Sequence, residues 1–302
     1  MDHNQGGSMS KQEFFDRYKQ LGQTPRDIVL HPTIRVNTLK ILPNALISRL
    51  TAKGFAVSKI PWLRYGYDVR LGKQSIGSTT EYLMGYYYTQ EAAAQLPVQV
   101  LDPQSGELVL DMCAAPGGKT TQISQWMQNT GTILALDKSF RLYSLKNNLE
   151  RTSAGNIIIY KKDARFATDF GMIFNKILLD APCTGNFVGD NTWFEKRALN
   201  DIRSRARLQK ELIKAAAKIL APGGTLVYST CSLEPEENEM IIDYILNKDT
   251  QLRLLDTGIE IGDPGLTSPF EKPLHQDIKK CTRLWPWNTN TQGFFIAKLT
   301  RT

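Results

Sequence analysis

Two cysteines of this chain each follow a hydrophobic run typical of a buried strand. Cys183 stands in the run Leu-Leu-Asp-Ala-Pro-Cys-Thr-Gly (178–185), and Cys231 stands in Leu-Val-Tyr-Ser-Thr-Cys-Ser (226–232). A lone buried cysteine is most often inert, but a thiolate is a strong nucleophile. Because the chain has only three histidines, an enzyme built on it would have to use thiols and carboxylates.

Three acidic residues, Asp111, Asp137 and Asp163, also follow predicted strands. In doubly wound sheets an acid at the end of the second strand accepts hydrogen bonds from the ribose hydroxyls, and Asp163 could accept one from an adenine amino group. The alternative for Asp137 is that it, or Ser139, caps the following helix. Three acids in step with three strand ends favour a nucleoside site.

The turn after Asp111 reads Met-Cys-Ala-Ala-Pro-Gly-Gly-Lys-Thr-Thr (112–121) and opens a predicted helix. A phosphate-binding P-loop requires glycine at the position of Cys113, and the dinucleotide pattern Gly-x-Gly-x-x-Gly is absent. The remaining functional interpretation is a nucleoside-binding turn of the S-adenosylmethionine type, in which no phosphate has to be held. The structural alternative is that the two glycines only make a tight turn.

Strands and helices alternate through the larger part of the chain, beyond residue 85. Strands are predicted at 107–112, 132–137, 156–160, 176–180, 225–230 and 293–299, and helices at 118–128, 139–151, 199–220 and 236–247. This alternation indicates an α/β fold with a parallel, doubly wound sheet that binds ligands at the carboxyl ends of its strands. In the usual order the fourth strand lies between the first and the fifth, which places Cys183 and Cys231 at one edge.

Residues 9–84 are predicted to form a small α+β module before this sheet. The periodicities indicate a helix at 11–21, a strand at 33–37, a helix at 43–53, strands at 55–60 and 67–71, and a short helix through Leu83 that Ser78 and Glu81 would cap. We place the boundary near residue 84, before a helix from Gln90 to Leu101. Residues 1–8 are interpreted as an expression tag before a natural start at Met9.

The chain carries a formal net charge of +7, with a pI near 9.1, which indicates a polyanionic partner or an ordinary basic surface. Residues 1–85 alone hold twelve Lys and Arg against six Asp and Glu. Aromatic residues there could stack on unpaired bases or belong to the core; they are Trp62, Tyr65 and Tyr67. The predicted helix at 199–220 carries a basic stripe that could follow phosphates or face solvent. The stripe consists of Arg203, Arg207, Lys210, Lys214 and Lys218.

The composition also argues against several classes of protein. No apolar run reaches the roughly 18 residues that span a bilayer, and no two of the four cysteines are close enough for a metal-binding knuckle. We therefore expect a cytoplasmic monomer with reduced thiols and no metal or membrane. Cys113 and Cys281 are interpreted as packing side chains, and Glu236, Glu237 and Glu239 as acids that suit the start of a helix.

Several motifs together resemble the RNA 5-methylcytosine methyltransferases of the NOL1/NOP2/Sun family, and the archaeal tRNA members in particular. The resemblance covers residues 35–298, and its most specific parts are the two cysteine motifs. The motifs are Arg-Val-Asn-Thr (35–38), Tyr-Thr-Gln-Glu (88–91), the turn at 111–120, Asp-Ala-Pro-Cys (180–183), Thr-Cys-Ser (230–232), Glu-Asn-Glu (237–239), Arg-Leu-Trp-Pro (283–286) and Gly-Phe-Phe-Ile-Ala-Lys (293–298).

The resemblance gives the two thiols a chemical purpose. Carbon 5 of cytosine is a poor nucleophile, so a thiolate first adds to carbon 6 while a hydrogen bond to the ring disperses the developing charge. Carbon 5 then attacks the methyl group of S-adenosylmethionine. By resemblance, Cys231 is the nucleophile and Cys183 assists release of the methylated product. Asp180 would hydrogen-bond the cytosine, and Lys119 would help to orient it.

The resemblance also implies a Rossmann-like, S-adenosylmethionine-dependent methyltransferase domain at 85–302, after an RNA-binding module at 9–84. Asp137 would bind the ribose and Asp163 the adenine, while the turn backbone would line the methionine part. The full set of implied cofactor contacts is Cys113, Ala114, Ala115, Pro116, Gly117, Gly118, Lys119, Asp137, Arg141, Asp163 and Asp180.

The expected function is therefore that of an RNA cytosine C5-methyltransferase, with tRNA as substrate because the appended module is small and basic. Ribosomal RNA is the alternative substrate; a non-catalytic RNA-binding protein and a small-molecule methyltransferase are the alternative functions. Three departures from the family pattern bear on the substrate. They are the loop at 186–194, Trp287 where a histidine is common, and Gln292 where an acid often precedes Gly-Phe-Phe.

Overall fold

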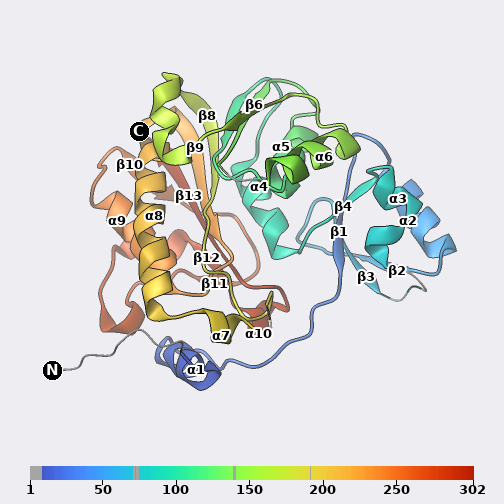
Figure 1. Cartoon of the computed structure of the whole chain (residues 1–302). Helices are drawn as coiled ribbons and strands as arrows, with labels where there is room; N and C mark the ends of the chain where they lie inside the picture. The colour runs from blue at the N-terminus through green and yellow to red at the C-terminus, as the bar shows by residue number, and fades with distance from the viewer. Residues whose placement is uncertain (1–8, 71, 73–74, 139–140, 191) are drawn as a thin grey trace.

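The computed structural model describes residues 9–70, 72, 75–138, 141–190 and 192–302. The residues interpreted as an expression tag, 1–8, lie outside the described residues, as does Ser139, the alternative helix cap. Within the described part, a small antiparallel sheet stands beside a large mixed sheet, and helices cover both faces of the large sheet (Figure 1).

The large sheet has the strand order β11-β12-β13-β9-β8-β5-β6-β7. Parallel strands form its centre: β5 (Leu108–Asp111), β6 (Thr132–Asp137), β7 (Ile157–Lys161), β8 (Phe174–Asp180) and β9 (Leu220–Thr230). β13 (Phe294–Arg301) adds antiparallel to β9. The predicted doubly wound order is confirmed, because β8 lies between β5 and β9.

The inner strands carry runs of successive buried apolar residues, such as 133–136 of β6 and 177–179 of β8, because helices cover both faces of the sheet. Along β5, Val109 packs in one core with α4 (Leu96–Leu101) and α5 (Gly118–Trp126). The next residue, Leu110, packs in the opposite core with α8 (Leu199–Lys218) and α9 (Glu239–Leu246), as expected for successive strand residues. α6 (Leu142–Thr152) packs against the turn after β5.

Several short elements were not predicted from the sequence, because they are too short to show a periodicity. They are the strands β4 (Tyr87–Thr89), β10 (Leu252–Leu255), β11 (Asp263–Pro264) and β12 (Thr282–Leu284), the helices α7 (Trp193–Lys196) and α10 (Pro286–Thr289), and the 3-10 segments Ile76–Ser78, Ala164–Phe170, Pro235–Glu237, Pro269–Glu271 and Gln276–Lys280. The continuous helix predicted from Gln90 is wrong: a 3-10 turn, Ala93–Gln95, precedes α4.

The small sheet has the order β2-β3-β1-β4, in which β1 (Thr33–Val36), β2 (Ala56–Lys59) and β3 (Gly66–Arg70) match predicted strands. α2 (Pro43–Ala52) packs Leu46 and Leu50 against it. Because β4 pairs with β1, the boundary expected near residue 84 falls inside this sheet. We propose that the module ends after Thr89.

The cap predicted for the short helix α3 (Thr80–Leu83) is wrong. The N-cap is Thr79, whose hydroxyl accepts a hydrogen bond from the backbone of Tyr82 at 3.0 Å. The carboxylate of Glu81 is buried and binds Arg49 and Lys53 of the neighbouring helix and turn. Glu81 therefore joins α3 to α2 instead of capping its own helix.

The N-terminal helix α1 (Lys11–Gln20) packs away from the small sheet, beside α7 and α10 (Figure 1). The ring of Phe14 lies 4.6 Å from that of Trp193. The hydroxyl of Tyr18 donates to Glu234 at 2.8 Å, and Arg17 forms ion pairs with Glu234 and Glu236. Residues 9–84 thus contribute to two separate parts of the molecule, a helix on the large domain and the small sheet.

Candidate active site and cofactor pocket

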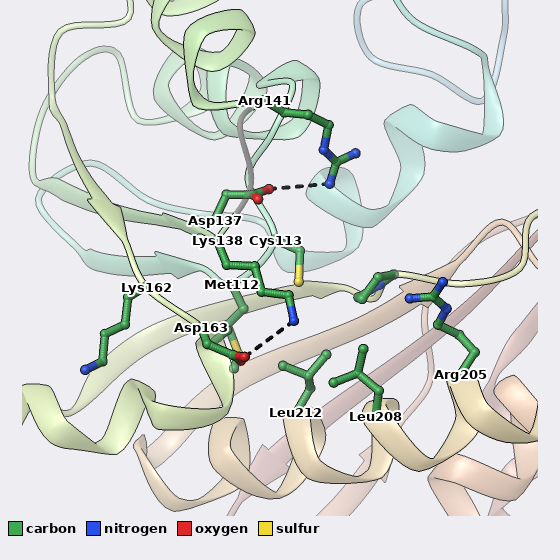
Figure 2. A pocket seen from close by; sticks show the side chains of 12 residues that line it. Met112, Cys113, Asp137, Lys138, Arg141, Lys162, Asp163, Arg205, Leu208 and Leu212 are labelled. Carbon is green, nitrogen blue, oxygen red and sulfur yellow. Dashed lines mark hydrogen bonds and ion pairs between the residues drawn. The ribbon is translucent and has the colours of Figure 1, made fainter.

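The carboxyl ends of β5, β6 and the segment after β7 surround a cavity of about 200 Å³, closed on one side by α8 (Figure 2). Apolar side chains from the end of β5 and from α8 form opposite walls, and the carboxylates of Asp137 and Asp163 lie at its rim. The lining residues are Met112, Cys113, Asp137, Lys138, Arg141, Lys162, Asp163, Ala164, Pro182, Arg205, Leu208 and Leu212. An apolar slot edged by acids suits a flat, uncharged base joined to a sugar.

Asp137, at the end of β6, holds the turn that follows β5. Its Oδ2 accepts a hydrogen bond from the backbone of Ala115 at 3.1 Å and lies 3.6 Å from the guanidinium of Arg141. The turn contains a cis peptide bond before Pro116. Gly117 has a φ of +106°, and an added Cβ would lie 3.0 Å from the side chain of Leu145, so glycine is required there.

The small sheet supports the same turn from the other side. Arg35 of β1 is buried, donates to the carbonyl of Gly118 at 2.6 Å, and donates to the hydroxyl of Thr121 at 2.8 Å. Burial lowers the pKa of Arg35 to about 9. The Arg-Val-Asn-Thr motif therefore joins the N-terminal module to the first turn of α5.

Asp163 lies at the other end of the cavity rim. Hydrogen bonds from Arg165 lower its pKa to about 2, and the ammonium of Lys138 lies 3.4 Å away (Figure 2). An ionised carboxylate only accepts hydrogen bonds, so Asp163 is suited to an amino group. Asp111, the third acid of the predicted nucleoside set, does not line the cavity; it accepts a hydrogen bond from Thr120 at 2.7 Å and fixes the start of α5.

Asp180, at the end of β8, is held by both carboxylate oxygens. Lys119 donates to Oδ2 at 2.7 Å, and Ser229 of β9 donates to Oδ1 at 2.8 Å. The ammonium of Lys119 also lies 5.2 Å from the ring centre of Phe294. The two predicted polar site residues therefore form one part-buried ion pair.

Cys183 and Cys231 meet at the sheet edge, where the strand order predicted them. Their sulfur atoms lie 3.2 Å apart, and both cysteines are free and partly exposed. The hydrogen bond with Cys231 and burial raise the pKa of Cys183 well above its ordinary value. This shift favours the thiol form of Cys183 over its thiolate.

Polar residues that the sequence analysis did not assign to the site hold the loop of Cys231. Asn186 donates to the carbonyl of Cys231 at 2.6 Å. Asn238 accepts from the hydroxyl of Thr230 at 2.6 Å and donates to the carbonyl of Ser232 at 2.9 Å. Asn186 lies three residues after Cys183, and Asn238 lies within the Glu-Asn-Glu motif (237–239). This closeness to family motifs is the signal that could have identified them.

Three acids lie at helix starts, as expected: Glu236 and Glu237 in the first turn of the 3-10 segment Pro235–Glu237, and Glu239 at the first position of α9. Each of them also has specific partners. Glu236 pairs with Arg17 of α1. Glu239 is fully buried and pairs with Arg283, which in turn donates to the carbonyl of Leu233 at 2.7 Å. Glu237 lies within the preceding 3-10 segment and faces the two cysteine loops. These carboxylates therefore bind specific partners in addition to lying at a helix start.

The sequence analysis also missed the apolar wall of this cavity. Leu208 and Leu212, four residues apart on α8, point into the cavity (Figure 2), and Leu212 also packs in the hydrophobic core. Cys113, interpreted as a packing residue, lines the same cavity, whereas Cys281 is buried in the core. The basic stripe lies on another face of α8, where Arg203, Arg207 and Lys210 line a separate surface hollow.

Most of the residues that depart from the family pattern pack against or near α1. Phe187, Trp193 and Phe194 pack together and contact the aromatic side chains of α1, and Trp287 stacks on Trp285 at 5.3 Å. The indole of Trp193 donates to the carbonyl of Thr184 at 2.8 Å. α1 therefore covers the loop that follows Cys183. The backbone of Gln292 donates to Glu91 at 2.9 Å.

The described residues contain no cluster of three or more His, Cys, Asp or Glu that could hold a metal ion. In the same part of the chain, no helix combines the length and the apolar character needed to cross a membrane.

Comparisons with known sequences agree with this geometry. Residues 98–300 match the family described as 16S rRNA methyltransferase RsmB/F, and residues 10–92 match the N-terminal domain of 16S rRNA methyltransferase RsmF. The chain is similar to the tRNA (cytosine(49)-C(5))-methyltransferase of Pyrococcus abyssi, at 34% identity over 99% of each protein. It is 39% identical to the human 28S rRNA (cytosine(4447)-C(5))-methyltransferase over 93% of this chain, but spans only 35% of that protein.

Two solved structures share the whole fold. A methyltransferase homolog from Pyrococcus horikoshii superposes with a TM-score of 0.83 at 41% identity, covering 94% of this chain and 89% of that one. NSun6 from Pyrococcus horikoshii, solved with SFG, superposes with a TM-score of 0.81 at 30% identity, covering 96% and 94%.

Proposed function

We propose that this chain, which belongs to the 16S rRNA methyltransferase RsmB/F family, transfers a methyl group from S-adenosylmethionine to carbon 5 of a cytosine in RNA. One observation carries the proposal: two free thiols, 3.2 Å apart, lie at the same sheet edge as the Lys119–Asp180 pair and the cavity lined by Asp137 and Asp163. Relatives named as RNA cytosine C5-methyltransferases support it.

The lining of the cavity suits S-adenosylmethionine. Leu208 and Leu212 would contact the adenine faces, Asp163 would accept from the adenine amino group, and Asp137 would bind the ribose hydroxyls. The turn from Ala114 to Gly118 would line the methionine part. When bound, the cofactor supplies an electrophilic methyl group on a sulfonium. The relative solved with SFG, an analogue of this cofactor, supports the assignment.

The remaining residues would act on the cytosine. The thiolate of Cys231 forms a bond to carbon 6, and Asp180, held by Lys119 and Ser229, hydrogen-bonds the cytosine. The ammonium of Lys119 offsets the negative charge that develops on the ring. Carbon 5 then takes the methyl group. A base removes the proton from carbon 5, the carbon 6–sulfur bond breaks, and the thiolate of Cys231 is restored. Cys183 assists this release.

The preferred substrate is tRNA. The Pyrococcus abyssi relative, a tRNA methyltransferase by name, matches this chain over nearly its whole length, so the same small N-terminal module accompanies both catalytic domains. Ribosomal RNA is a second candidate, because the human relative and the family model carry rRNA methyltransferase names. A non-catalytic RNA-binding protein would not need both thiols and the Lys119–Asp180 pair.

Bisulfite sequencing of total RNA after incubation with the protein and S-adenosylmethionine tests the function. The expected result is protection of cytosine at a defined tRNA position, absent without cofactor. Protection confined to rRNA would move the substrate to the second candidate. Cofactor binding without protection of any cytosine would favour the non-catalytic alternative.

A further inference from the structure

Glu237 lies behind the two cysteines, between the loops that carry them. Its side chain is fully buried. Oε1 accepts from the hydroxyl of Thr184 and, at 2.9 Å, from the hydroxyl of Ser232. Oε2 accepts from the backbone of Thr184 at 3.1 Å and from Gln209 of α8 at 2.8 Å.

These partners are the immediate neighbours of the two thiols in the chain. Thr184 follows Cys183, and Ser232 follows Cys231. Gln209 also donates to the carbonyl of Pro182, the residue before Cys183, at 3.0 Å. One carboxylate is therefore hydrogen-bonded to both cysteine loops at once.

The buried environment of Glu237 is energetically unfavourable for an ionised carboxylate. Burial raises its pKa to about 7, although its hydrogen bonds act in the opposite direction. Among the described residues, no lysine or arginine forms a salt bridge with it. Burying a carboxyl group without a counter-ion reduces stability, and simple packing would be served as well by an apolar residue. Four groups donate hydrogen bonds to the carboxylate of Glu237, and we therefore interpret Glu237 as a link between the two cysteine loops.

We propose that Glu237 is a positioning residue for the methyl transfer, which fixes the separation of the Cys183 and Cys231 thiols by accepting hydrogen bonds from both loops. The inference rests on the proposed function. Asn186 links the two loops directly through its hydrogen bond to the carbonyl of Cys231. Glu237 links the same loops through its buried carboxylate, behind the two cysteines. A misplacement of about 1 Å at a reacting centre can slow a reaction about 100-fold.

Two substitutions of Glu237 distinguish the effect of its hydrogen bonds from the effect of its negative charge. In Glu237→Gln, the amide oxygen can accept from Thr184 and Gln209, and the amide nitrogen can donate to the two hydroxyl oxygens, which are able to rotate. In Glu237→Ala, every bond between the loops through this side chain is lost. Glu234→Gln is the matched control, because Glu234 is equally buried but binds Arg17 and Tyr18 instead of the cysteine loops.

Two measurements report on the thiols. The first is the single-turnover rate of covalent adduct formation with tRNA containing 5-fluorocytosine, whose fluorine replaces the proton that must leave. The second is independent of activity: diamide takes two electrons and two protons from a pair of thiols to form a disulfide, and peptide mass spectrometry quantifies the 183–231 product. Cofactor affinity and thermal unfolding accompany both.

We expect Glu237→Ala to slow adduct formation by about 10- to 100-fold and disulfide formation by roughly 10-fold, with cofactor affinity unchanged. Glu237→Gln should stay within about 3-fold of the wild type in both rates, which the retained hydrogen bonds predict. Glu234→Gln should leave both rates unchanged. Wild-type rates in Glu237→Ala would overturn the inference, and so would a Glu237→Gln protein as slow as Glu237→Ala, since charge would then be the cause.

Two further results keep the test decisive. If Glu237→Ala does not fold, Ser232→Ala removes the link from Glu237 to the Cys231 loop, together with the bond that the Ser232 hydroxyl accepts from the backbone of Glu234, and should slow disulfide formation. An unchanged rate there would contradict the inference. If the wild type forms no adduct with RNA, the proposed function fails, while the disulfide rates still test whether Glu237 sets the thiol separation.

Discussion

The ammonium of Lys119 lies 2.7 Å from Oδ2 of Asp180, although the residues come from the start of α5 and the end of β8. With Ser229 on the other oxygen, the carboxylate is fixed before any substrate arrives. A preorganised polar group stabilises developing charge without having to reorient.

Lys119→Met should lower the rate of methyl transfer on the order of 100-fold, the usual effect of removing a preorganised group at a reacting centre. Transfer of radiolabelled methyl groups from S-adenosylmethionine to tRNA measures the rate. Lys146→Met, on the exposed face of α6, is the control and should be fully active. Full activity in Lys119→Met would show that Asp180 does not need its partner.

Asp137→Ala should raise the dissociation constant of S-adenosylmethionine by about 10- to 100-fold, since a hydrogen bond to a charged group contributes about 1.5–3 kcal/mol. The substitution also removes the acceptor for the backbone of Ala115. Isothermal titration calorimetry checks the constant, with the exposed acid substitution Asp27→Ala as control. An unchanged constant would place the cofactor ribose elsewhere.

Phe14→Ala should lower the free energy of unfolding by about 3–5 kcal/mol, as for other buried phenylalanines. Phe14 is fully buried against Trp193, whose indole holds the carbonyl of Thr184 beside Cys183. Methyl transfer should therefore fall as well. Urea unfolding measures the first effect, and Leu42→Ala, at an exposed apolar position, is the control. Wild-type stability in Phe14→Ala would contradict the docking of α1.

Asp111→Asn should make stability less dependent on pH. Burial raises the pKa of Asp111 to about 7 in the folded protein, against about 3.9 in an unfolded chain. Between these values the unfolded state loses its proton first, so the contribution of Asp111 to stability is present below about pH 4 and is lost as the pH rises through 7. An asparagine side chain does not titrate in this range, so the Asp111→Asn variant lacks this pH-dependent contribution to stability.

Unfolding free energies at pH 5 and pH 8 test this prediction. The decrease between the two should be smaller in Asp111→Asn than in the wild type, with a residual decrease from Glu237, whose pKa is also raised to about 7. The exposed variant Asp27→Asn should follow the wild type. Parallel decreases in Asp111→Asn and the wild type would contradict a raised pKa at Asp111.

The strand ends could be predicted because most of the central strands contain a run of apolar residues that is followed by a polar motif. Cys183 and Cys231 fall at one sheet edge for this reason, because parallel neighbouring strands bring their carboxyl ends together. The short antiparallel strands β10 to β12 lack a readable period, and the pairing of β4 with β1 depends on tertiary contacts, which explains the misplaced boundary near residue 84.

The residues that hold the site side chains in place could not be predicted from local sequence patterns. Leu212 has the spacing of a core residue whether it faces a core or a cavity. Glu237 lies near a helix start, where an acid can interact with the helix dipole or connect two buried loops, and its sequence position does not distinguish these roles. The bonds of Tyr18 and Arg17 to Glu234 join residues more than 200 positions apart. Only the folded chain brings those partners together.

The most direct test of the account is covalent adduct formation by the two cysteine variants with tRNA and S-adenosylmethionine, resolved on denaturing gels. Cys231→Ala should form no adduct and transfer no methyl group, because it lacks the nucleophile. Cys183→Ala should accumulate a protein–RNA adduct, because the methylated product is not released. Adduct in Cys231→Ala and none in Cys183→Ala would reverse the assignment of the two thiols, and no adduct in either variant would contradict the covalent route.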